Sequence, residues 1–347
     1  MNNDINQSTP QHIMQIGMSF WNSKVLLTAV KFELFTLLAV QKSMSGSEIK
    51  KALSFKCSER HTYDFLDVLT GLNLLQREGI WNNARYSNST ETNIFLDKNK
   101  PSYVGGILEM ANDRLFRFWA DLDEALLTGQ PQNELKHSEE SMFKALYADP
   151  ERLKQFMNAM SGVSVGNFVT LATTFDFSHY KTLCDVGGAA GILSIQVAKH
   201  NPNMKCTSLD LPPVEPIARE TIASHGLSDR VRTGVIDFFT DEFPKADVIT
   251  MGMILHDWDL ENKKMLIKKA YNALPEGGAF IAIESIIDNE RVNNVFGLSM
   301  SLNMLIEFGV AFDFTGDDFT SWAKEAGFKR VEILPLAGPS SAAIAIK

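Results

Sequence analysis

The spacing of apolar residues changes twice along this chain. From residue 12 to residue 38, apolar side chains recur with the period of a helix, and so much apolar surface near one end requires a core or a second subunit to cover it. Short helical segments follow, and then a two-stranded ribbon over Gly79–Tyr86 that turns at Asn82-Asn83. Short helices with such a ribbon predict a winged-helix outline, and we expect residues 1–100 to form this mainly helical N-terminal domain.

Residues 101–175 keep a helical spacing and are rich in methionine and phenylalanine, among them Met142, Phe143, Phe156 and Met160. Most such side chains belong to a core, but both residue types also adapt to flat ligands, so some of them could line an apolar pocket. We expect this segment to be a helical linker that lines the pocket of a substrate.

From residue 180 onward, strands and helices alternate. The predicted strands are Thr182–Asp185, Lys205–Asp210, Arg230–Ile236, Asp247–Gly252, Ala279–Glu284, Arg330–Pro335 and Ala342–Ile346. The helices predicted between the first five are Ile192–Lys199, Val214–His225 and Asp259–Leu274. This alternation is typical of a doubly wound, mostly parallel sheet. The last two strands leave no room for a crossover helix, so residues 176–347 should form a seven-stranded α/β domain that ends in an antiparallel hairpin.

The charge of the chain argues against a surface that coats nucleic acid, since the formal net charge is −9. The winged-helix outline still raises a DNA-binding interpretation. However, the helix in the recognition position carries Glu59, Asp64 and Asp67, which would face phosphates. A structural or dimerising role for this domain therefore fits better than a role in reading DNA.

No apolar stretch approaches the roughly 20 residues that span a membrane, and we see no secretory signal. The three cysteines, Cys57, Cys184 and Cys206, are far apart and fit neither a metal-binding spacing nor a disulfide framework. We therefore expect reduced thiols, a cytoplasmic location, no membrane association and no metal site.

Titratable residues mark the expected carboxyl ends of the strands, where doubly wound sheets bind their ligands. One such residue ends or follows each of five successive strands: Asp185, Asp210, Asp237, His256 and Glu284. Any one of them could be an ordinary loop residue. Their convergence on one edge of the sheet indicates a functional site.

The loop after the first of these strands contains Gly187, Gly188 and Gly191. It is a poor dinucleotide fingerprint, because Ala189 and Ile192 stand where Gly-x-Gly-x-x-Gly needs glycine. The loop suits close approach of the backbone to a ligand without a pyrophosphate. The acid that opens it favours a cationic or hydroxyl-bearing ligand.

Two further strand ends fit the parts of a nucleoside. Asp210 stands where a carboxylate can accept both ribose hydroxyls. Asp237 and Phe238 could hold an adenine, the acid binding its exocyclic amine and the ring packing on its face.

His256 is the candidate general base, because the unperturbed pKa of histidine lies near neutrality. A histidine in this position could also be structural. Either Glu284 or Asp313 could orient its second ring nitrogen and stabilise its charged form, which favours the catalytic interpretation.

Four motifs together resemble one family: Asp185-Val186-Gly187-Gly188-Ala189-Ala190-Gly191, Leu209-Asp210-Leu211-Pro212, Leu255-His256-Asp257-Trp258 and Ala273-Leu274-Pro275-Glu276-Gly277-Gly278. The sequence resembles the S-adenosylmethionine-dependent O-methyltransferases of the plant caffeic-acid, hydroxyindole and bacterial natural-product type, over nearly the whole chain. The resemblance implies a Rossmann-like class I methyltransferase fold and a homodimer formed through the N-terminal domain. It also implies S-adenosyl-L-methionine as cofactor, no metal, and a small hydroxylated aromatic acceptor.

The resemblance also implies roles for single residues. The cofactor would be bound by Asp185, Gly187, Gly188, Gly191, Asp210, Leu211, Asp237 and Phe238. His256 would deprotonate the acceptor hydroxyl, flanked by Glu284 and Asp313. The acceptor would be bound by Phe156, Met160, Asp257, Met304 and Phe308, with Phe20 reaching into the site of the partner subunit.

The chain departs from the family pattern at four places. Ala189-Ala190 replaces the usual Gly-Thr, and Asp313 stands where many plant members have Glu. Gly252 stands where plant members often have Lys, and Phe308 replaces an Asn that plant enzymes use on the acceptor. Plant substrate preferences should therefore not be transferred to this chain.

O-methylation of a small phenol is the function that these observations predict. An N- or C-methyltransferase, or a member of the fold that transfers no methyl group, is the alternative among cofactor-binding proteins. A winged-helix transcriptional regulator is the alternative from another class.

Overall fold

A computed structural model describes residues 9–134, 136 and 149–347, so Met142 and Phe143 lie outside the described residues. The chain divides into two compact units, one up to Phe116 and one from Arg117 to the C-terminus. The separate linker expected over residues 101–175 stays a prediction.

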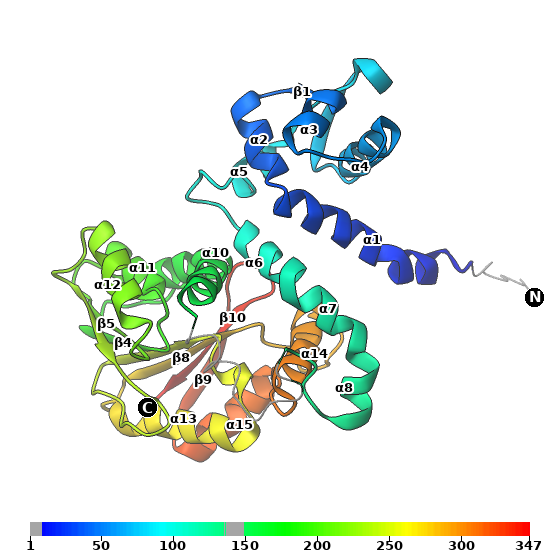
Figure 1. Cartoon of the computed structure of the whole chain (residues 1–347). Helices are drawn as coiled ribbons and strands as arrows, with labels where there is room; N and C mark the ends of the chain where they lie inside the picture. Colours follow the sequence, from blue (N-terminus) through cyan, green and yellow to red (C-terminus); the bar gives the residue numbers. More distant parts are fainter. Residues whose placement is uncertain (1–8, 135, 137–148) are drawn as a thin grey trace, which may run out of the picture. The chain divides into compact units, whose positions relative to one another are not determined.

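The first unit combines helices with a small antiparallel sheet (Figure 1). Its described helices are α1 (Gln11–Lys31), α2 (Leu34–Gln41), α3 (Gly46–Ala52), α4 (Glu59–Gly71), α5 (Thr90–Phe95), α6 (Gly105–Met110) and the π-helical turn η2 (Ala111–Leu115). Its strands are β1 (Met44–Ser45), β2 (Leu75–Glu78) and β3 (Arg85–Asn88), in the order β1-β3-β2. These are the element types that the winged-helix outline requires.

The ribbon of this unit begins earlier in the chain than expected. Leu75 pairs with Asn88 and Glu78 with Arg85, so residues 79–84 form the connection between the strands. Asn82-Asn83 lies in that connection as part of a 3-10 helix, η1 (Trp81–Asn83), and not as a two-residue turn.

The acids of α4 are paired within their own unit. Asp64 accepts from Arg60 at 3.2 Å, and Asp67 pairs with Arg77 at 2.7 Å and accepts from the hydroxyl of Tyr86. These carboxylates therefore have local partners on the helix that would occupy the recognition position.

The second unit holds a seven-stranded sheet in the order β6-β5-β4-β7-β8-β10-β9. The strands are β4 (Thr182–Val186), β5 (Lys205–Asp210), β6 (Val231–Val235), β7 (Val248–Gly252), β8 (Ala279–Glu284), β9 (Arg330–Pro335) and β10 (Ser341–Ile346). The first five run parallel, whereas β10 lies antiparallel between β8 and β9. The predicted mostly parallel sheet with its C-terminal hairpin is confirmed.

Helices cover both faces of this sheet (Figure 1). Helices α10 (Pro150–Thr174), α11 (Ile192–His200) and α12 (Glu215–Ser224) pack on one face, while α13 (Leu260–Ala273) and α15 (Gly316–Ala326) pack on the other. The remaining described helices are α7 (Phe116–Phe118), η3 (Trp119–Asp121), α8 (Leu122–Thr128), η4 (Leu255–Asp257) and α14 (Val295–Phe308). Helix α14 was not predicted from the sequence.

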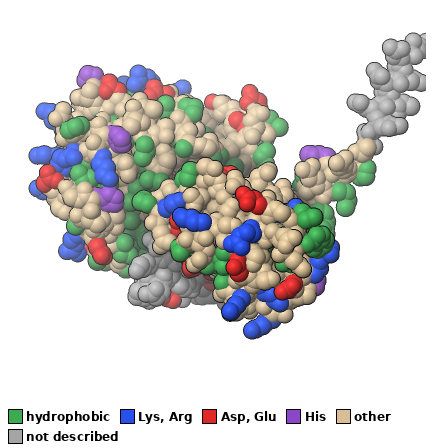
Figure 2. Space-filling model, turned by 90° about the horizontal axis from the view of Figure 1, so that it is seen from above, with side chains coloured by type: hydrophobic (Ala, Val, Ile, Leu, Met, Phe, Trp, Pro, Cys, Tyr) green, Lys and Arg blue, Asp and Glu red, His purple; other side chains and the backbone are tan. Residues whose placement is uncertain are grey.

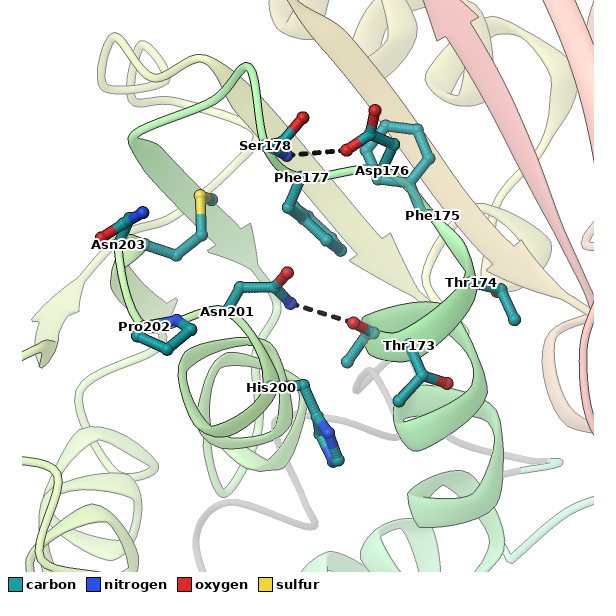
Figure 3. Close-up of a pocket in the computed structure, with 12 residues that line it drawn as sticks. Thr173, Thr174, Phe175, Asp176, Phe177, Ser178, His200, Asn201, Pro202 and Asn203 are labelled. Carbon is teal, nitrogen blue, oxygen red and sulfur yellow. Dashed lines mark hydrogen bonds between the residues drawn. The ribbon is translucent and has the colours of Figure 1, made fainter.

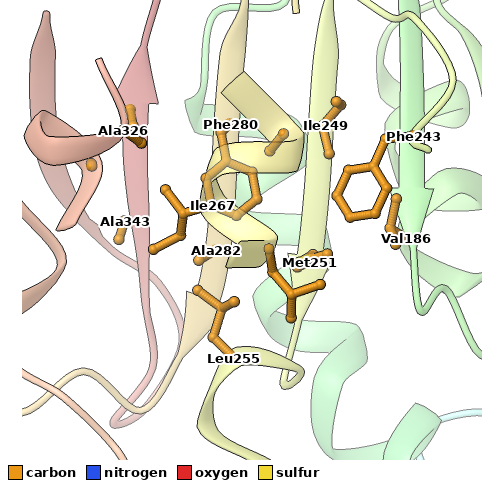
Figure 4. Packing of buried hydrophobic residues seen from close by; sticks show 14 of the residues in the cluster. Val186, Phe243, Ile249, Met251, Leu255, Ile267, Phe280, Ala282, Ala326 and Ala343 are labelled. Carbon is orange, nitrogen blue, oxygen red and sulfur yellow. The ribbon is translucent and has the colours of Figure 1, made fainter. Parts of the chain in front are cut away.

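The core on the α13 and α15 face is large and aromatic (Figure 4). Phe280 of β8 is fully buried, and its ring stacks with that of Phe319 at a centroid distance of 6.1 Å and with that of Phe328 at 6.2 Å. Every residue of β8 is buried, because a central strand of a parallel sheet is covered on both faces. This packing fixes the strand whose last residue is Glu284.

Charged side chains of both signs are scattered over the face of the molecule shown in Figure 2.

Cys184 and Cys206 are buried free thiols, and burial raises the pKa of each to about 12, whereas Cys57 is exposed. In the described part of the chain, no helix combines the length and the apolar character needed to cross a bilayer.

We predict that Phe280→Ala destabilises the second unit by about 3–5 kcal/mol, because the cavity left between two aromatic neighbours cannot close. The midpoint of urea unfolding, followed by circular dichroism, measures this loss. Phe296→Ala is the matched control, since that ring is 50% exposed and should change the midpoint little. A loss below about 1 kcal/mol for Phe280→Ala would contradict the packing described here.

Candidate active site

The strand order places a topological switch point beside β4. Strand β5 follows β4 in the chain and lies on one side of it, while β7 lies on the other side. In such sheets the connections leave in opposite directions at this point and open a crevice at the carboxyl ends. The loops after β4, β5 and β7 meet at this edge.

The loop after β4 is a backbone cradle. Gly187, Ala189 and Gly191 have φ of +75°, +48° and +77°, so a left-handed residue occurs at every second position. The amides of Gly187 and Gly188 both donate to the carbonyl of Leu209, at 2.9 and 3.0 Å. The second of these left-handed residues is an alanine, which accepts this conformation less readily than glycine.

A side chain at either of the first two loop positions would clash with a neighbouring side chain unless that neighbour moved. A Cβ on Gly187 would lie 2.5 Å from Cδ1 of Ile254, and one on Gly188 would lie 2.2 Å from the hydroxyl of Ser208. The loop therefore lies directly against the residues that precede His256 and against β5.

Asp185 lies one residue inside β4, not at the strand end where the sequence analysis placed it. It is 3% exposed, and its Oδ1 accepts from the hydroxyl of Thr250 at 2.8 Å. Burial raises the pKa of Asp185 to about 7. The carboxyl group also lies beside the glycine loop, since a Cβ on Gly188 would be 2.9 Å from its Oδ2.

Asp210 ends β5 and holds the loop from the side. Its Oδ2 accepts from the amide of Ala189 at 2.9 Å and its Oδ1 from the amide of Leu211 at 2.7 Å. Burial raises the pKa of Asp210. Each carboxylate oxygen retains a free lone pair direction, so the group can still accept from two vicinal hydroxyls.

Asp237 and Phe238 follow β6 in a loop whose backbone is bound by the side chains of Asp237 and of Lys269 on α13. Asp237 accepts from the amide of Phe239 at 3.0 Å, and Lys269 donates to the carbonyls of Phe238, Phe239 and Asp241, each at 2.9 Å. The ring of Phe238 lies 5.9 Å from that of Trp258. The loop thus presents an aromatic wall beside the glycine cradle.

His256 lies in η4, just after β7, and is 4% exposed. Its Nδ1 lies 3.4 Å from Oδ1 of Asp313 and 3.8 Å from Oε2 of Glu284. Its Nε2 lies 3.4 Å from Oδ1 of Asp257. The imidazole is therefore surrounded by three carboxylates.

Glu284 binds the backbone of the histidine loop as well. Its Oε1 accepts from the amides of Ile254 and Leu255, at 3.2 and 3.0 Å, while its Oε2 faces the ring. The chain enters this loop through Met253, whose φ of +54° is unusual for a residue other than glycine. A strained residue next to the candidate base is typical of functional sites.

The electrostatics of the cluster favour a charged imidazole. Burial alone would lower the pKa of His256, but the charges of Glu284, Asp257 and Asp313 raise it to about 10. Burial raises the pKa of Glu284 to about 7 and that of Asp257 to about 6, although His256 opposes both shifts. The carboxylates would therefore stabilise a proton that arrives on the ring.

The same three side chains have the spacing of metal ligands. His256, Glu284 and Asp313 offer atoms that all lie within 4.8 Å of one another. The same carboxylate oxygens face the imidazole, so the arrangement also fits an acid–base role. The expectation that this site uses no metal stays a prediction.

The residues proposed from the sequence for the acceptor lie on α10, α14 and α1, except for Asp257 in η4. Phe156 and Ala189 of the glycine loop pack against one buried cluster, and Met160 is half-buried one turn further along α10. Met304 is buried on α14 and Phe308 ends that helix. Phe20, on α1 of the first unit, is 50% exposed.

A pocket of about 590 Å³ lies at the opposite end of the sheet (Figure 3). Residues 172–178 after α10 and residues 200–204 after α11 line it. Asn201 closes one side by donating to the carbonyl of Ala172 at 2.9 Å. The pocket lies next to the amino ends of β4 and β5, where parallel sheets do not bind their substrates, and none of the proposed site residues lines it.

Sequence reasoning missed two residues near the cluster. Trp258 packs on the aromatic loop after β6, although it was quoted only as part of a motif. Lys263 of α13 is fully buried. Its signal was available, since it shares the apolar helix face of Leu266, Ile267 and Ala270 at spacings of three, four and seven.

Comparison with known proteins gives a consistent picture. Residues 119–329 match the model of an O-methyltransferase domain, and residues 14–98 match that of an O-methyltransferase dimerisation domain. The tetracenomycin polyketide synthesis 8-O-methyl transferase TcmO of Streptomyces glaucescens is 37% identical over 97% of both chains. The N,N-dimethyltransferase OxyT of Streptomyces rimosus is 31% identical over 91% of this chain and 90% of its own.

One solved structure is similar over the full length. It is human N-acetylserotonin methyltransferase in complex with S-adenosylmethionine, which aligns with a TM-score of 0.89 at 26% identity and covers 100% of this chain and 99% of its own. The order of strands and helices is thus shared with a protein that binds this cofactor.

We predict that Gly188→Ala weakens binding of S-adenosylmethionine about tenfold or more, because the new methyl group displaces Ser208 or the loop itself. Isothermal titration calorimetry measures this loss. The double variant Gly188→Ala with Ser208→Ala should recover part of the affinity, since the clashing hydroxyl is gone. Gly166→Ala on α10 is the control, because its nearest neighbour would be 3.5 Å away, at ordinary contact distance.

Proposed function

This chain belongs to the family of S-adenosylmethionine-dependent O-methyltransferases, and we propose that it methylates a hydroxyl group of a small, flat aromatic acceptor with His256 as the general base. The observation that carries the proposal is the imidazole held between buried carboxylates beside the glycine cradle. The aromatic acceptor is supported by relatives whose names specify a polyketide and N-acetylserotonin.

The cradle fits the cofactor in three respects. Gly187 and Gly188 leave no room for side chains, so the methionine part can approach the backbone closely. Asp210 offers oxygens to the ribose hydroxyls, and Leu211 lies beside it. Asp237 and Phe238 would bind the adenine at the aromatic wall, and Asp185 would act from beneath Gly188 and Gly191.

The cofactor, when bound, supplies a methyl group that is already electrophilic. The protein then has to align the acceptor oxygen, exclude water and remove one proton. Nε2 of His256 would take the hydroxyl proton, while Glu284 and Asp313 beside Nδ1 stabilise the imidazolium. Because the ring has to be neutral before the transfer, the rate should rise with pH.

The acceptor would lie between α10 and α14, next to His256. Met160 and Met304 would contact its ring faces, with Phe156 and Phe308 at the ends, since methionine and phenylalanine adapt to flat ligands. Asp257 would accept a hydrogen bond from a second polar group of the acceptor.

The dimerisation domain supports a homodimer formed through the first unit. Ile13, Ile16 and Trp21 of α1 are 73%, 61% and 59% exposed, which leaves an apolar helix for a second subunit to cover. Phe20 on the same helix would reach the acceptor of the partner. A cytoplasmic location stays a prediction.

N-methylation is the second candidate, because one similar protein is named as an N,N-dimethyltransferase. A panel of phenols and aromatic amines, incubated with cofactor and analysed by mass spectrometry, separates the two. A gain of one methyl group on phenols alone supports O-methylation, whereas a gain only on nitrogen or carbon would overturn it. A gel-shift titration tests the DNA-binding alternative, which requires retention that weakens with salt.

We predict that His256→Ala lowers kcat about 100- to 10,000-fold, because the acceptor hydroxyl loses its general base. Binding of S-adenosylmethionine should stay within about twofold of the parent protein, because His256 lies outside the cradle. His179→Ala is the control, since that side chain is 85% exposed. Near-normal turnover of His256→Ala would exclude this residue as the base.

A further inference from the structure

Lys263 is a buried, titratable residue near the site whose chemistry the proposed reaction does not use. It lies in the first turn of α13 and is 0% exposed. Burial of an ammonium group costs free energy unless other groups compensate its charge. The groups around Lys263 therefore have to compensate its positive charge.

Two contacts tie Lys263 to the two segments that form the histidine site. Its Nζ donates to the carbonyl of Trp258, two residues after His256. The same Nζ lies 3.6 Å from the centre of the Phe312 ring, and Phe312 directly precedes Asp313. One ammonium group thus joins the histidine loop to the segment between α14 and α15.

The charges around Lys263 are those of the histidine site. The carboxylates of Glu284, Asp313, Asp257 and Asp259 all act on it, and burial lowers its pKa to about 8. The group is therefore still charged at pH 7.

The same carboxylates also act on the imidazole of His256. Glu284, Asp257 and Asp313 all favour its protonated form, and Glu307 of α14 adds its negative charge to the surroundings of Asp257. A general base in this environment needs a nearby positive charge if it is to be neutral when the acceptor arrives.

We propose that Lys263 is a positioning residue for methyl transfer: its buried ammonium group holds the His256 loop against the Asp313 segment and offsets the carboxylates around the imidazole. The inference rests on the proposed role of His256. It assigns to Lys263 the task of increasing the fraction of neutral imidazole at working pH, while Glu284 and Asp313 stabilise the proton once it has moved. Lys263 itself touches neither substrate.

The test is the pH dependence of kcat/KM, measured from pH 6 to pH 10 for Lys263→Met. Lys263 of the parent is charged below about pH 8, and loss of that charge favours the imidazolium, so in this range the rising limb should shift to higher pH by about one unit. Activity at pH 7 should then fall about tenfold, and the two profiles should converge above pH 8, where the parent lysine has itself lost its proton. The affinity for S-adenosylmethionine should not change.

Two further variants separate charge from packing. Lys263→Gln keeps a donor for the Trp258 carbonyl but no charge, so it should show the same shift, whereas Lys263→Arg should stay close to the parent profile. These two decide the question if Lys263→Met does not fold. Lys264→Met is the matched control, since Lys264 is a partly exposed neighbour that pairs with Glu325 at 2.6 Å.

An equal loss at every pH in Lys263→Met would overturn the proposal and leave a packing role only, and so would a Lys263→Gln profile identical to that of the parent. Failure of the proposed function gives a different result. In that case His256→Ala retains turnover, whatever the Lys263 variants do. If His256 is the base, the residual activity of His256→Ala should lack the rising limb altogether.

Discussion

The compensation of buried charge around His256 is the constraint on which the site depends. An imidazole and three carboxylates out of contact with water are costly unless each has a partner of opposite charge or a hydrogen bond. Asp257 is the next residue to His256 in η4, whereas Glu284 from the end of β8 and Asp313 from the segment before α15 come from distant parts of the chain. The cluster can form only when the sheet and its covering helices are in place.

The strand ends around the switch point would have two different roles in the proposed reaction. The loops after β4 and β5 provide a backbone cradle with few charges, suited to a ligand that must be approached closely. In the proposed reaction, the ends of β7 and β8 would provide the proton chemistry. Ile254 links the two, because it lies against Gly187 on one side and its amide binds Glu284 on the other. A change in the cradle would therefore also disturb the base.

The two units of the chain differ in how their apolar side chains are covered. The second buries its central strands on both faces and has a large aromatic core. The first leaves apolar side chains along α1 in contact with solvent, which agrees with its match to a dimerisation domain. Asp64 and Asp67 of α4 are paired with arginines of the same unit, whereas Glu59 accepts from the hydroxyl of Ser47.

The sequence by itself determined the order of the strands in the second unit and their boundaries to within one residue, because alternating apolar runs and capped helices are local signals. It also determined the convergence of Asp210, His256 and Glu284, since parallel strands place their carboxyl ends at one edge. Only the tertiary structure decided that the carboxyl group of Asp185 lies beside Gly188 and that β2 begins before the expected ribbon. It also decided that Asp257 faces Nε2 of His256. The same holds for Lys263, whose periodicity marked a buried position but not its neighbours. The physical reason is that local patterns specify which face of an element is covered, whereas the partner of a buried charge is set by segments far apart in the sequence.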